Sequence, residues 1–259
     1  MANWRNASGR PLASPEWLEA HHLAKLPESR RFAERLAALC PARIVDLGCG
    51  TGLWLDLLNE VLSDDCEFIG LDSDPDAAAL ACTRCARWQR PVVIRQLEIE
   101  AESRSIPACD LALAFNVFPY LEDPAAVIAE LARKGTALAV RQYDGAALRF
   151  GPMGNQLRTA VETSLQAAVG ASEQFRHYDM DRVFSTLTSA AYTERTFEFE
   201  LFARTDPFPP EFLDYYEGMM GWTLELLSED AASAMRSWLA DPNVGGRYFF
   251  EVDLTAVLS

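Results

Sequence analysis

Short apolar runs alternate with helical segments over the first 145 residues of the chain. The runs lie at 43–47, 67–72, 92–97, 111–115 and 137–140. Mostly apolar runs of this length are typical of strands that are buried on both faces. Because helical segments separate them, the pattern predicts an α/β fold built on a parallel, doubly wound sheet.

Two helical segments precede the first of these runs, at 15–39. Ser14-Pro15 is a favourable helix start, because a capping hydroxyl is followed by a proline whose missing N–H costs nothing there. Pro27 is expected to break the segment. The pattern predicts an N-terminal helical cap over residues 1–40.

The pattern changes after residue 145. Helical segments are expected at 152–169 and 179–191, while 196–201 and 248–254 alternate apolar and polar residues. Such alternation is typical of antiparallel strands with one face near solvent, so we expect Glu198, Glu200, Glu251 and Asp253 to point outward. Together the runs predict a mostly parallel seven-stranded sheet with antiparallel C-terminal strands.

A helical insertion at about 207–241 carries many aromatic residues. Two interpretations are open, and they are compatible. The aromatic side chains either pack as a helical pair, or form a lid over a ligand with amphipathic side chains on the pocket wall.

The charge of the chain narrows the choice of partners. There are 38 acidic and 23 basic residues, a formal net charge of -15, which argues against binding to nucleic acid or anionic membranes. No run approaches the roughly 18 apolar residues of a membrane-spanning helix, and the N-terminus lacks the apolar middle of a secretory signal. We expect a cytoplasmic protein that acts on a small molecule.

The six cysteines are expected to be reduced thiols. The one C-x-x-C, at Cys82 and Cys85, falls within a helical segment, and neither a second pair nor nearby histidines complete a zinc site. No metal is expected.

A glycine-rich loop, Gly48-Cys49-Gly50-Thr51-Gly52, joins the first strand to its helix. Alternate glycines allow a sharp turn and leave the backbone open to a ligand. The spacing is G-x-G-x-G rather than the G-x-G-x-x-G of dinucleotide sites, and the preceding Asp46 would repel a phosphate. Asp72, which ends the second strand, suits the two hydroxyl donors of a ribose.

This combination resembles the class I S-adenosylmethionine-dependent methyltransferases over about residues 43–144. The resemblance implies S-adenosylmethionine as cofactor and S-adenosylhomocysteine as product. It implies that Glu98, with Glu100 as its rival, lies near the adenine. The cofactor-binding positions that it implies are Asp46, Gly48, Cys49, Gly50, Gly52, Asp72, Ser73, Glu98, Ile99, Asn116 and Val117. The chain is then one domain, with a cap (1–40), a cofactor-binding core (41–145) and a substrate side (146–259).

The methyl acceptor stays open. The Asn-Pro-Pro-aromatic motif of many amine methylases is absent, and Phe118-Pro119-Tyr120 stands where many small-molecule relatives carry a histidine pair. The sulfonium of the cofactor is itself an electrophile, so a general base helps only if the acceptor loses a proton. His177 is the candidate base, ahead of His21 and His22.

Several residues after the fourth and fifth strands are candidate substrate contacts. Arg149 could bind a carboxylate or phosphate and Asp144 an amine, or the two could brace a loop as an ion pair. The candidates are Tyr120, Tyr143, Asp144, Arg149, Tyr178, Tyr216 and Trp222.

The leading hypothesis is transfer of a methyl group to oxygen or nitrogen of a small molecule, with natural-product biosynthesis as one setting. A non-catalytic S-adenosylmethionine-binding or scaffolding protein is the alternative, and a nicotinamide-dependent oxidoreductase is disfavoured by the glycine spacing. A monomer and a homodimer are both open.

Overall fold

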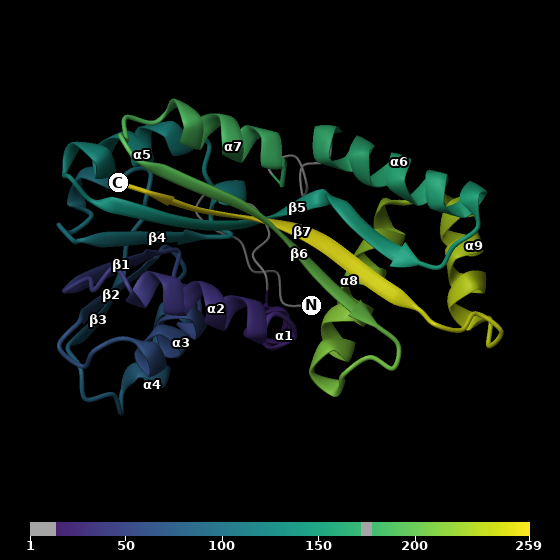
Figure 1. The fold of residues 1–259 in the computed structure, drawn as a ribbon, viewed down its shortest axis with the longest axis horizontal. Coiled ribbons are helices and arrows are strands. Elements are labelled where there is room, and N and C mark those ends of the chain that lie inside the picture. Colours follow the sequence, from purple (N-terminus) through teal and green to yellow (C-terminus); the bar gives the residue numbers. More distant parts are fainter. Residues whose placement is uncertain (1–13, 172–177) are drawn as a thin grey trace.

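A seven-stranded sheet runs through the computed structural model, which describes residues 14–171 and 178–259 (Figure 1). The strand order is β3-β2-β1-β4-β5-β7-β6. The strands are β1 (Arg43–Leu47), β2 (Glu67–Asp72), β3 (Val92–Gln96), β4 (Leu111–Phe115), β5 (Ala137–Gly151), β6 (Arg195–Thr205) and β7 (Tyr248–Leu258). Strands β1 to β5 pair in parallel, and β7 is antiparallel to both β5 and β6. The predicted fold class is confirmed.

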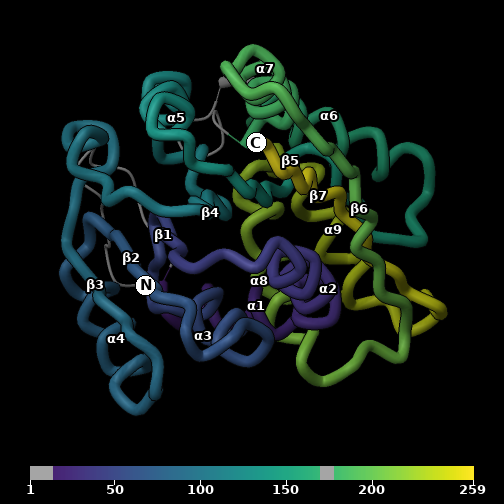
Figure 2. The backbone as a smooth tube through the Cα atoms, turned by 60° about the vertical axis from the view of Figure 1, so that its left-hand side comes forward, coloured from purple at the N-terminus to yellow at the C-terminus, as the bar shows by residue number. Residues whose placement is uncertain are grey.

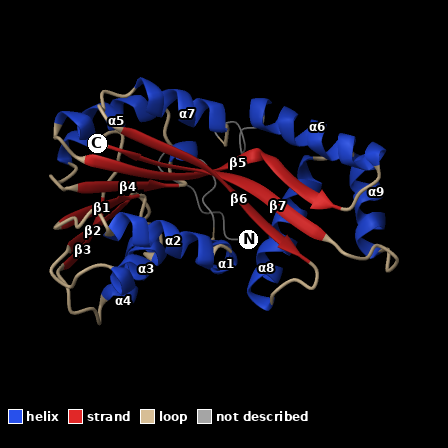
Figure 3. Ribbon diagram, in the orientation of Figure 1, coloured by secondary structure: helices blue, strands red, loops and turns tan. Residues whose placement is uncertain are grey.

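Helices cover both faces of the sheet (Figure 3). They are α1 (Pro15–Ala24), α2 (Leu26–Ala37), α3 (Leu53–Val61), α4 (Pro75–Cys85), α5 (Pro124–Arg133), α6 (Asn155–Ala171), α7 (Met180–Ser189), α8 (Pro210–Leu226) and α9 (Glu229–Ala240), with short 3-10 turns η1 (Ser103–Ser105) and η2 (Phe118–Tyr120). Helices α5 and α7 lie on one face, and α2, α3 and α4 lie on the other. Helices α6, α8 and α9 pack around the far ends of β5, β6 and β7.

Neighbouring residues of the central strands enter different cores. Val45 packs in the core that contains residues of α5 and α7, whereas Ile44 packs with residues of α2 and α3. Ala112 and Leu111 divide in the same way. Because side chains on a strand alternate between faces, a sheet covered on both sides produces the apolar runs seen in the sequence.

Strand β5 is much longer than the predicted run at 137–140. It continues to Gly151, with a register shift between Tyr143 and Leu148, and pairs with β7 along most of its length. The sequence did not predict this continuation because Arg141 and Gln142 are polar. Both residues are nevertheless buried. Tyr143, Asp144 and Arg149 therefore lie within a strand and not in a loop after it.

The helical cap bends at Lys25, two residues before Pro27. Lys25 ends α1 and begins α2, while Pro27 lies in the first turn of α2, where its missing N–H is tolerated. At the other end of α1, the Ser14 Oγ accepts a hydrogen bond from the Trp17 backbone N–H (3.2 Å). Helices α1 and α2 thus lie where two helical segments were predicted, with the break between them displaced toward the N-terminus.

Glu251 and Asp253 do not point outward, so that prediction is wrong. Their residues are 0% and 2% exposed, and they face Lys25 of the cap and Arg141 of β5. The Lys25 Nζ lies 2.8 Å from the Asp253 Oδ1 and also pairs with Glu251, and the Arg141 Nη2 lies 2.7 Å from the Asp253 Oδ2. Opposite charges and hydrogen bonds compensate for the loss of water around each ion.

The aromatic insertion is a packed core. Phe212, Tyr215 and Met219 of α8 are buried against Phe202 and Phe249. The Tyr215 hydroxyl donates to Glu251 (2.7 Å to Oε2), so this core is tied to the buried ions beneath the cap.

Within the described ranges, no helix is long and apolar enough to cross a membrane. The cysteines at all six positions have free thiols. No group of three or more His, Cys, Asp or Glu side chains among the described residues is arranged to hold a metal ion.

Replacing Lys25 by methionine tests how far the fold depends on the buried ions. Lys25→Met leaves Glu251 without its ammonium partner, and breaking a buried pair costs roughly 3–5 kcal/mol. Urea denaturation should show this loss. Arg30→Met is the matched control, because its pair with Glu60 is exposed (40% and 54%) and should contribute less than about 1 kcal/mol. Equal effects of the two substitutions would contradict the assignment.

Candidate functional site

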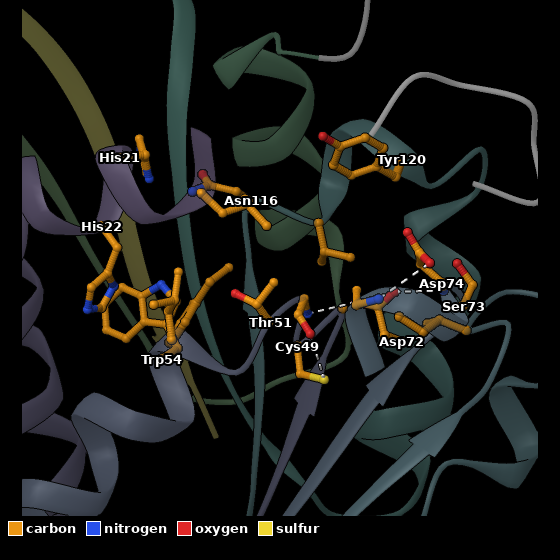
Figure 4. A pocket seen from close by; sticks show the side chains of 18 of the residues that line it. His21, His22, Cys49, Thr51, Trp54, Asp72, Ser73, Asp74, Asn116 and Tyr120 are labelled. Carbon is orange, nitrogen blue, oxygen red and sulfur yellow. Dashed lines mark hydrogen bonds between the residues drawn. The ribbon is translucent and has the colours of Figure 1, made fainter. Parts of the chain in front are cut away.

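A cavity opens at the carboxyl ends of the parallel strands, below α1 (Figure 4). This is where doubly wound sheets bind ligands. The described residues that line it are Trp17, Leu18, His21, His22, Gly48, Cys49, Gly50, Thr51, Leu53, Trp54, Asp72, Ser73, Asp74, Ala77, Glu98, Ile99, Phe115, Asn116, Val117, Tyr120, Leu121, Tyr143 and Tyr178. One end carries carboxylates, and the other end is aromatic.

The glycine loop exposes its backbone to the cavity. Gly48 and Gly50 have φ values of +69° and +52°, in the left-handed region that favours glycine. A Cβ on Gly48 would lie 2.8 Å from the Val117 Cγ2, so a larger residue would strain the backbone and push Val117.

Asp72 is fixed at the end of β2 by two backbone donors. Its Oδ2 accepts from the Gly50 N–H (2.7 Å) and its Oδ1 from the Asp74 N–H (2.9 Å). Each oxygen keeps a further lone pair for a ligand hydroxyl. Burial raises the pKa of Asp72, although these N–H groups favour the charged form.

Asp46 and Gly52 are not among the lining residues. Asp46 is 2% exposed on β1, and burial raises its pKa well above the ordinary value, with repulsion from Asp72 adding to the shift. Gly52 has a φ of +80° and begins α3. Both residues shape the loop from behind rather than facing the cavity.

Glu98 rather than Glu100 lines the cavity. The Glu100 carboxylate is occupied by the backbone N–H groups of Glu122 (3.0 Å) and Asp123 (2.6 Å). Burial raises the pKa of Glu98, and the nearby Glu100 raises it further. The geometry therefore favours Glu98 of the two rivals.

Asn116 holds the junction between β4 and η2. Its φ of 55° is left-handed, a conformation that asparagine adopts more readily than most residues. The Asn116 Oδ1 accepts from the Tyr143 N–H (3.4 Å). This hydrogen bond links the end of β4 to β5 at the middle of the cavity.

Three tyrosines from separate segments meet at the aromatic end. The Tyr120 and Tyr178 hydroxyl oxygens are 3.1 Å apart, and the Tyr143 and Tyr178 ring centroids are 4.9 Å apart. Burial raises the pKa of Tyr143 and Tyr178 well above the ordinary value, which keeps both hydroxyls protonated.

Helix α1 supplies four lining residues, of which only His21 and His22 were candidates from the sequence, as bases ranked behind His177. Trp17, Leu18, His21 and His22 line the cavity, and residues at i, i+1, i+4 and i+5 share one helical face. Figure 4 shows His21 and His22 projecting from this helix, across the cavity from Asp72. The spacing was the available signal, but it is equally typical of a helix that packs on a core.

Burial keeps both of these histidines uncharged at neutral pH. It lowers the pKa of His21 well below the ordinary value, and the Lys25 ammonium adds to the shift. It lowers the pKa of His22 to about 4, with Arg84 adding to the effect. The Nε2 of His21 is buried without a hydrogen-bond partner among the described residues.

Four predicted substrate contacts do not line the cavity. The Asp144 carboxylate accepts from the Ala146, Ala147 and Met180 backbone N–H groups, so it braces the irregular stretch of β5 against the start of α7. Arg149 pairs with Glu162 (2.6 Å) beside a separate groove, and not with Asp144. Tyr216 is buried in the aromatic core. Trp222 lies behind Tyr178, with 6.0 Å between ring centroids.

The candidate base His177 lies outside the described residues. Twelve predicted positions in the described part of the chain line the cavity: Gly48, Cys49, Gly50, Asp72, Ser73, Glu98, Ile99, Asn116, Val117, Tyr120, Tyr143 and Tyr178.

Helix α8 fixes the cap from behind, and Figure 2 shows α1 and α8 side by side. The Trp17 and Tyr215 rings stack with centroids 5.3 Å apart. A Cβ on Gly218 would lie 2.1 Å from the Trp17 Cζ3. The close approach therefore needs glycine at 218, and it sets the position of a cavity wall.

Comparison with known proteins finds similarity to methyltransferases. Residues 45–134 match the family model described as "Methyltransferase domain". The chain is 28% identical to the ubiquinone biosynthesis O-methyltransferase of Methylococcus capsulatus over 108 residues, 41% of this chain and 44% of that protein. It is 33% identical to the trans-aconitate 2-methyltransferase of Methylobacterium nodulans over 136 residues, 50% of each. The chain thus matches about half the length of these curated relatives.

A solved structure supports the fold over nearly the whole chain. The YcgJ protein of Bacillus subtilis superposes with a TM-score of 0.54 at 14% identity, covering 90% of this chain and 98% of that one. At this identity the likeness concerns the fold alone.

Alanine at Gly218 should move the wall of the cavity. Gly218→Ala places a methyl group against Trp17, so we expect lower thermal stability and weaker binding of cavity ligands. Gly221→Ala on the same helix is the control, because nothing lies within 4 Å of its Cβ position, and it should stabilise by roughly 0.4–1 kcal/mol. Both variants are compared by calorimetric melting. Similar stabilisation by both alanines would contradict the prediction, because Trp17 would then move aside without cost.

Proposed function

We propose that this chain, in which residues 45–134 match the methyltransferase domain model, is a class I S-adenosylmethionine-dependent methyltransferase that transfers a methyl group to oxygen or nitrogen of a small molecule. Natural-product biosynthesis is one setting that fits a small, aromatic acceptor. The observation that carries the proposal is the Asp72 carboxylate, held by two backbone donors at the edge of a cavity.

The cavity has groups that suit each part of S-adenosylmethionine. Asp72 retains lone pairs for the two ribose hydroxyls, and Ser73 lies beside it. Glu98 and Ile99 offer an acceptor and an apolar surface for the adenine. The open backbone of Gly48 and Gly50 leaves room for the methionine part.

The charge at this end suits a cation better than a phosphate. Asp72, Asp74 and Glu98 are carboxylates, and no lysine or arginine lines the cavity among the described residues. A dinucleotide pyrophosphate would be repelled here. This observation argues against the nicotinamide-dependent alternative.

When bound, S-adenosylmethionine supplies an electrophilic methyl group, so the chain needs no nucleophile of its own. The protein's part is then to orient the acceptor and to exclude water. Trp17 and His21 cover the cavity from α1, Tyr143 encloses it from β5, and Tyr178 encloses it from the segment just before α7. These aromatic walls remove competing water from the acceptor side.

Replacing Asp72 by asparagine should weaken the cofactor complex. Asp72→Asn removes a charged acceptor, so S-adenosylmethionine and S-adenosylhomocysteine should both bind roughly 1.5–3 kcal/mol more weakly. Titration calorimetry measures this directly. Asp65→Asn, at an exposed position, is the control. Unchanged affinity in a folded Asp72→Asn protein would move the ribose site elsewhere, and no binding to the wild type would end the proposal.

On acidification, cofactor affinity should begin to fall at a higher pH than it would if Asp72 had the pKa of an ordinary aspartate. The raised pKa of Asp72 means that its carboxylate, and hence full affinity, is lost on acidification at a pH above the ordinary value of about 3.9. The measurement is S-adenosylhomocysteine titration at decreasing pH. Asp46 and Glu98 also titrate, so the test is the difference from Asp72→Asn. Parallel curves for the two proteins would contradict the assignment.

A further inference from the structure

Among the residues that the structure describes, the aromatic end of the cavity carries no cation of the kind that an anionic acceptor would need. Its lining residues in the described part of the chain include Trp17, Trp54, Phe115 and Tyr143, and none is a lysine or an arginine. A carboxylate moved from water to such a place would lose hydration without gaining a partner.

Two cations that act on His21, Lys25 and Arg141, are already neutralised behind the wall. The Lys25 side chain is 1% exposed and the Arg141 side chain 3%. Lys25 pairs with both Glu251 and Asp253. Arg141 donates twice to Asp253 (2.9 and 2.7 Å) and once to the Ser29 Oγ (3.1 Å). An anionic acceptor would have to break this cluster to reach either charge.

His21 supplies a polar atom at this end. Its ring lies 5.9 Å from the Tyr143 ring and 5.3 Å from the Tyr215 ring, centroid to centroid. Its buried Nε2 has no hydrogen-bond partner among the described residues, and a buried polar atom without a partner is destabilising. Because the imidazole is uncharged, Nε2 can accept a hydrogen bond from a ligand hydroxyl.

We infer that the acceptor is an uncharged phenol, held between the aromatic side chains with its hydroxyl donating to the His21 Nε2. This inference rests on the proposed function and names its substrate class. It separates the chain's substrate from a polycarboxylate such as the one in the name of its trans-aconitate relative.

The reaction balances with these groups. The O–CH₃ bond forms as the S–CH₃ bond of S-adenosylmethionine breaks, and the bonding pair stays on sulfur. The hydroxyl proton passes to the His21 Nε2 and then to water. A phenolic oxygen that is gaining a methyl group becomes strongly acidic, so a weak base suffices. Lys25 and Arg141 disfavour the imidazolium, which promotes release of that proton.

A matched pair of ligands tests the charge of the acceptor. The full chain, saturated with S-adenosylhomocysteine, is titrated with 4-ethylphenol and with 4-ethylbenzoate, which share the same ring and alkyl group. We expect the phenol to bind at least about tenfold more tightly, since tenfold corresponds to only about 1.4 kcal/mol. Equal or tighter binding of the benzoate overturns the inference.

A second pair tests the role of His21 without relying on turnover. The methyl ether 4-ethylanisole cannot donate a hydrogen bond, so the wild type should prefer 4-ethylphenol to it by roughly tenfold, the value of one hydrogen bond. His21→Phe should abolish this preference and leave the affinity for S-adenosylhomocysteine unchanged. Leu23→Ala, an exposed position on the same helix, should retain it.

The possible failures are distinguishable. Absence of S-adenosylhomocysteine binding to the wild type refutes the proposed function itself. Normal cofactor binding without a phenol preference refutes the acceptor class alone. If His21→Phe does not fold, the wild-type comparison of phenol with anisole still decides, because equal affinities would mean that no hydrogen bond forms to the hydroxyl.

Discussion

The buried ion cluster of Lys25, Arg141, Glu251 and Asp253 is the interaction on which the arrangement of the site depends. It joins the bend of the helical cap to strands β5 and β7. Four residues before this bend, His21 faces the cavity, and Trp17 lies one turn further along α1. The cluster therefore helps to fix the position of this cavity wall relative to the sheet.

The same cluster shapes the electrostatics of the cavity. Its carboxylates pair with the two cations behind the aromatic wall, Lys25 and Arg141. These two charges still disfavour a proton on His21. Tyr215 extends the network, because its hydroxyl donates to Glu251 while its ring stacks on Trp17. The aromatic core around α8 thus contributes to the site through α1, without lining the cavity with Tyr216 or Trp222.

The parallel half of the fold and its glycine loop could be predicted from local sequence. Each central strand is a mostly apolar run, Gly48 and Gly50 lie just after β1, and Asp72 ends β2, so the topology brings them to one edge of the sheet. The prediction that Glu251 and Asp253 point outward was wrong for a physical reason. Glu251 and Asp253 alternate with apolar residues as solvent-facing positions do, and the partners that bury them lie 228 and 112 positions away from Asp253. No local period contains that information.

The length of strand β5 and the role of helix α1 also could not be read from local sequence. Because Arg141 and Gln142 are polar, the sequence predicted that the fifth strand ends before them. A polar residue inside a sheet can be recognised only when its partner is known. The face of α1 that carries Trp17 and His21 has the spacing of an ordinary core-facing stripe. What makes it a cavity wall is the space left beneath it by glycines 48 and 50 and by the end of β4. The missing side chains of the glycine loop thus leave the space that the side chains of α1 line. This relation between two distant segments appears only in the three-dimensional structure.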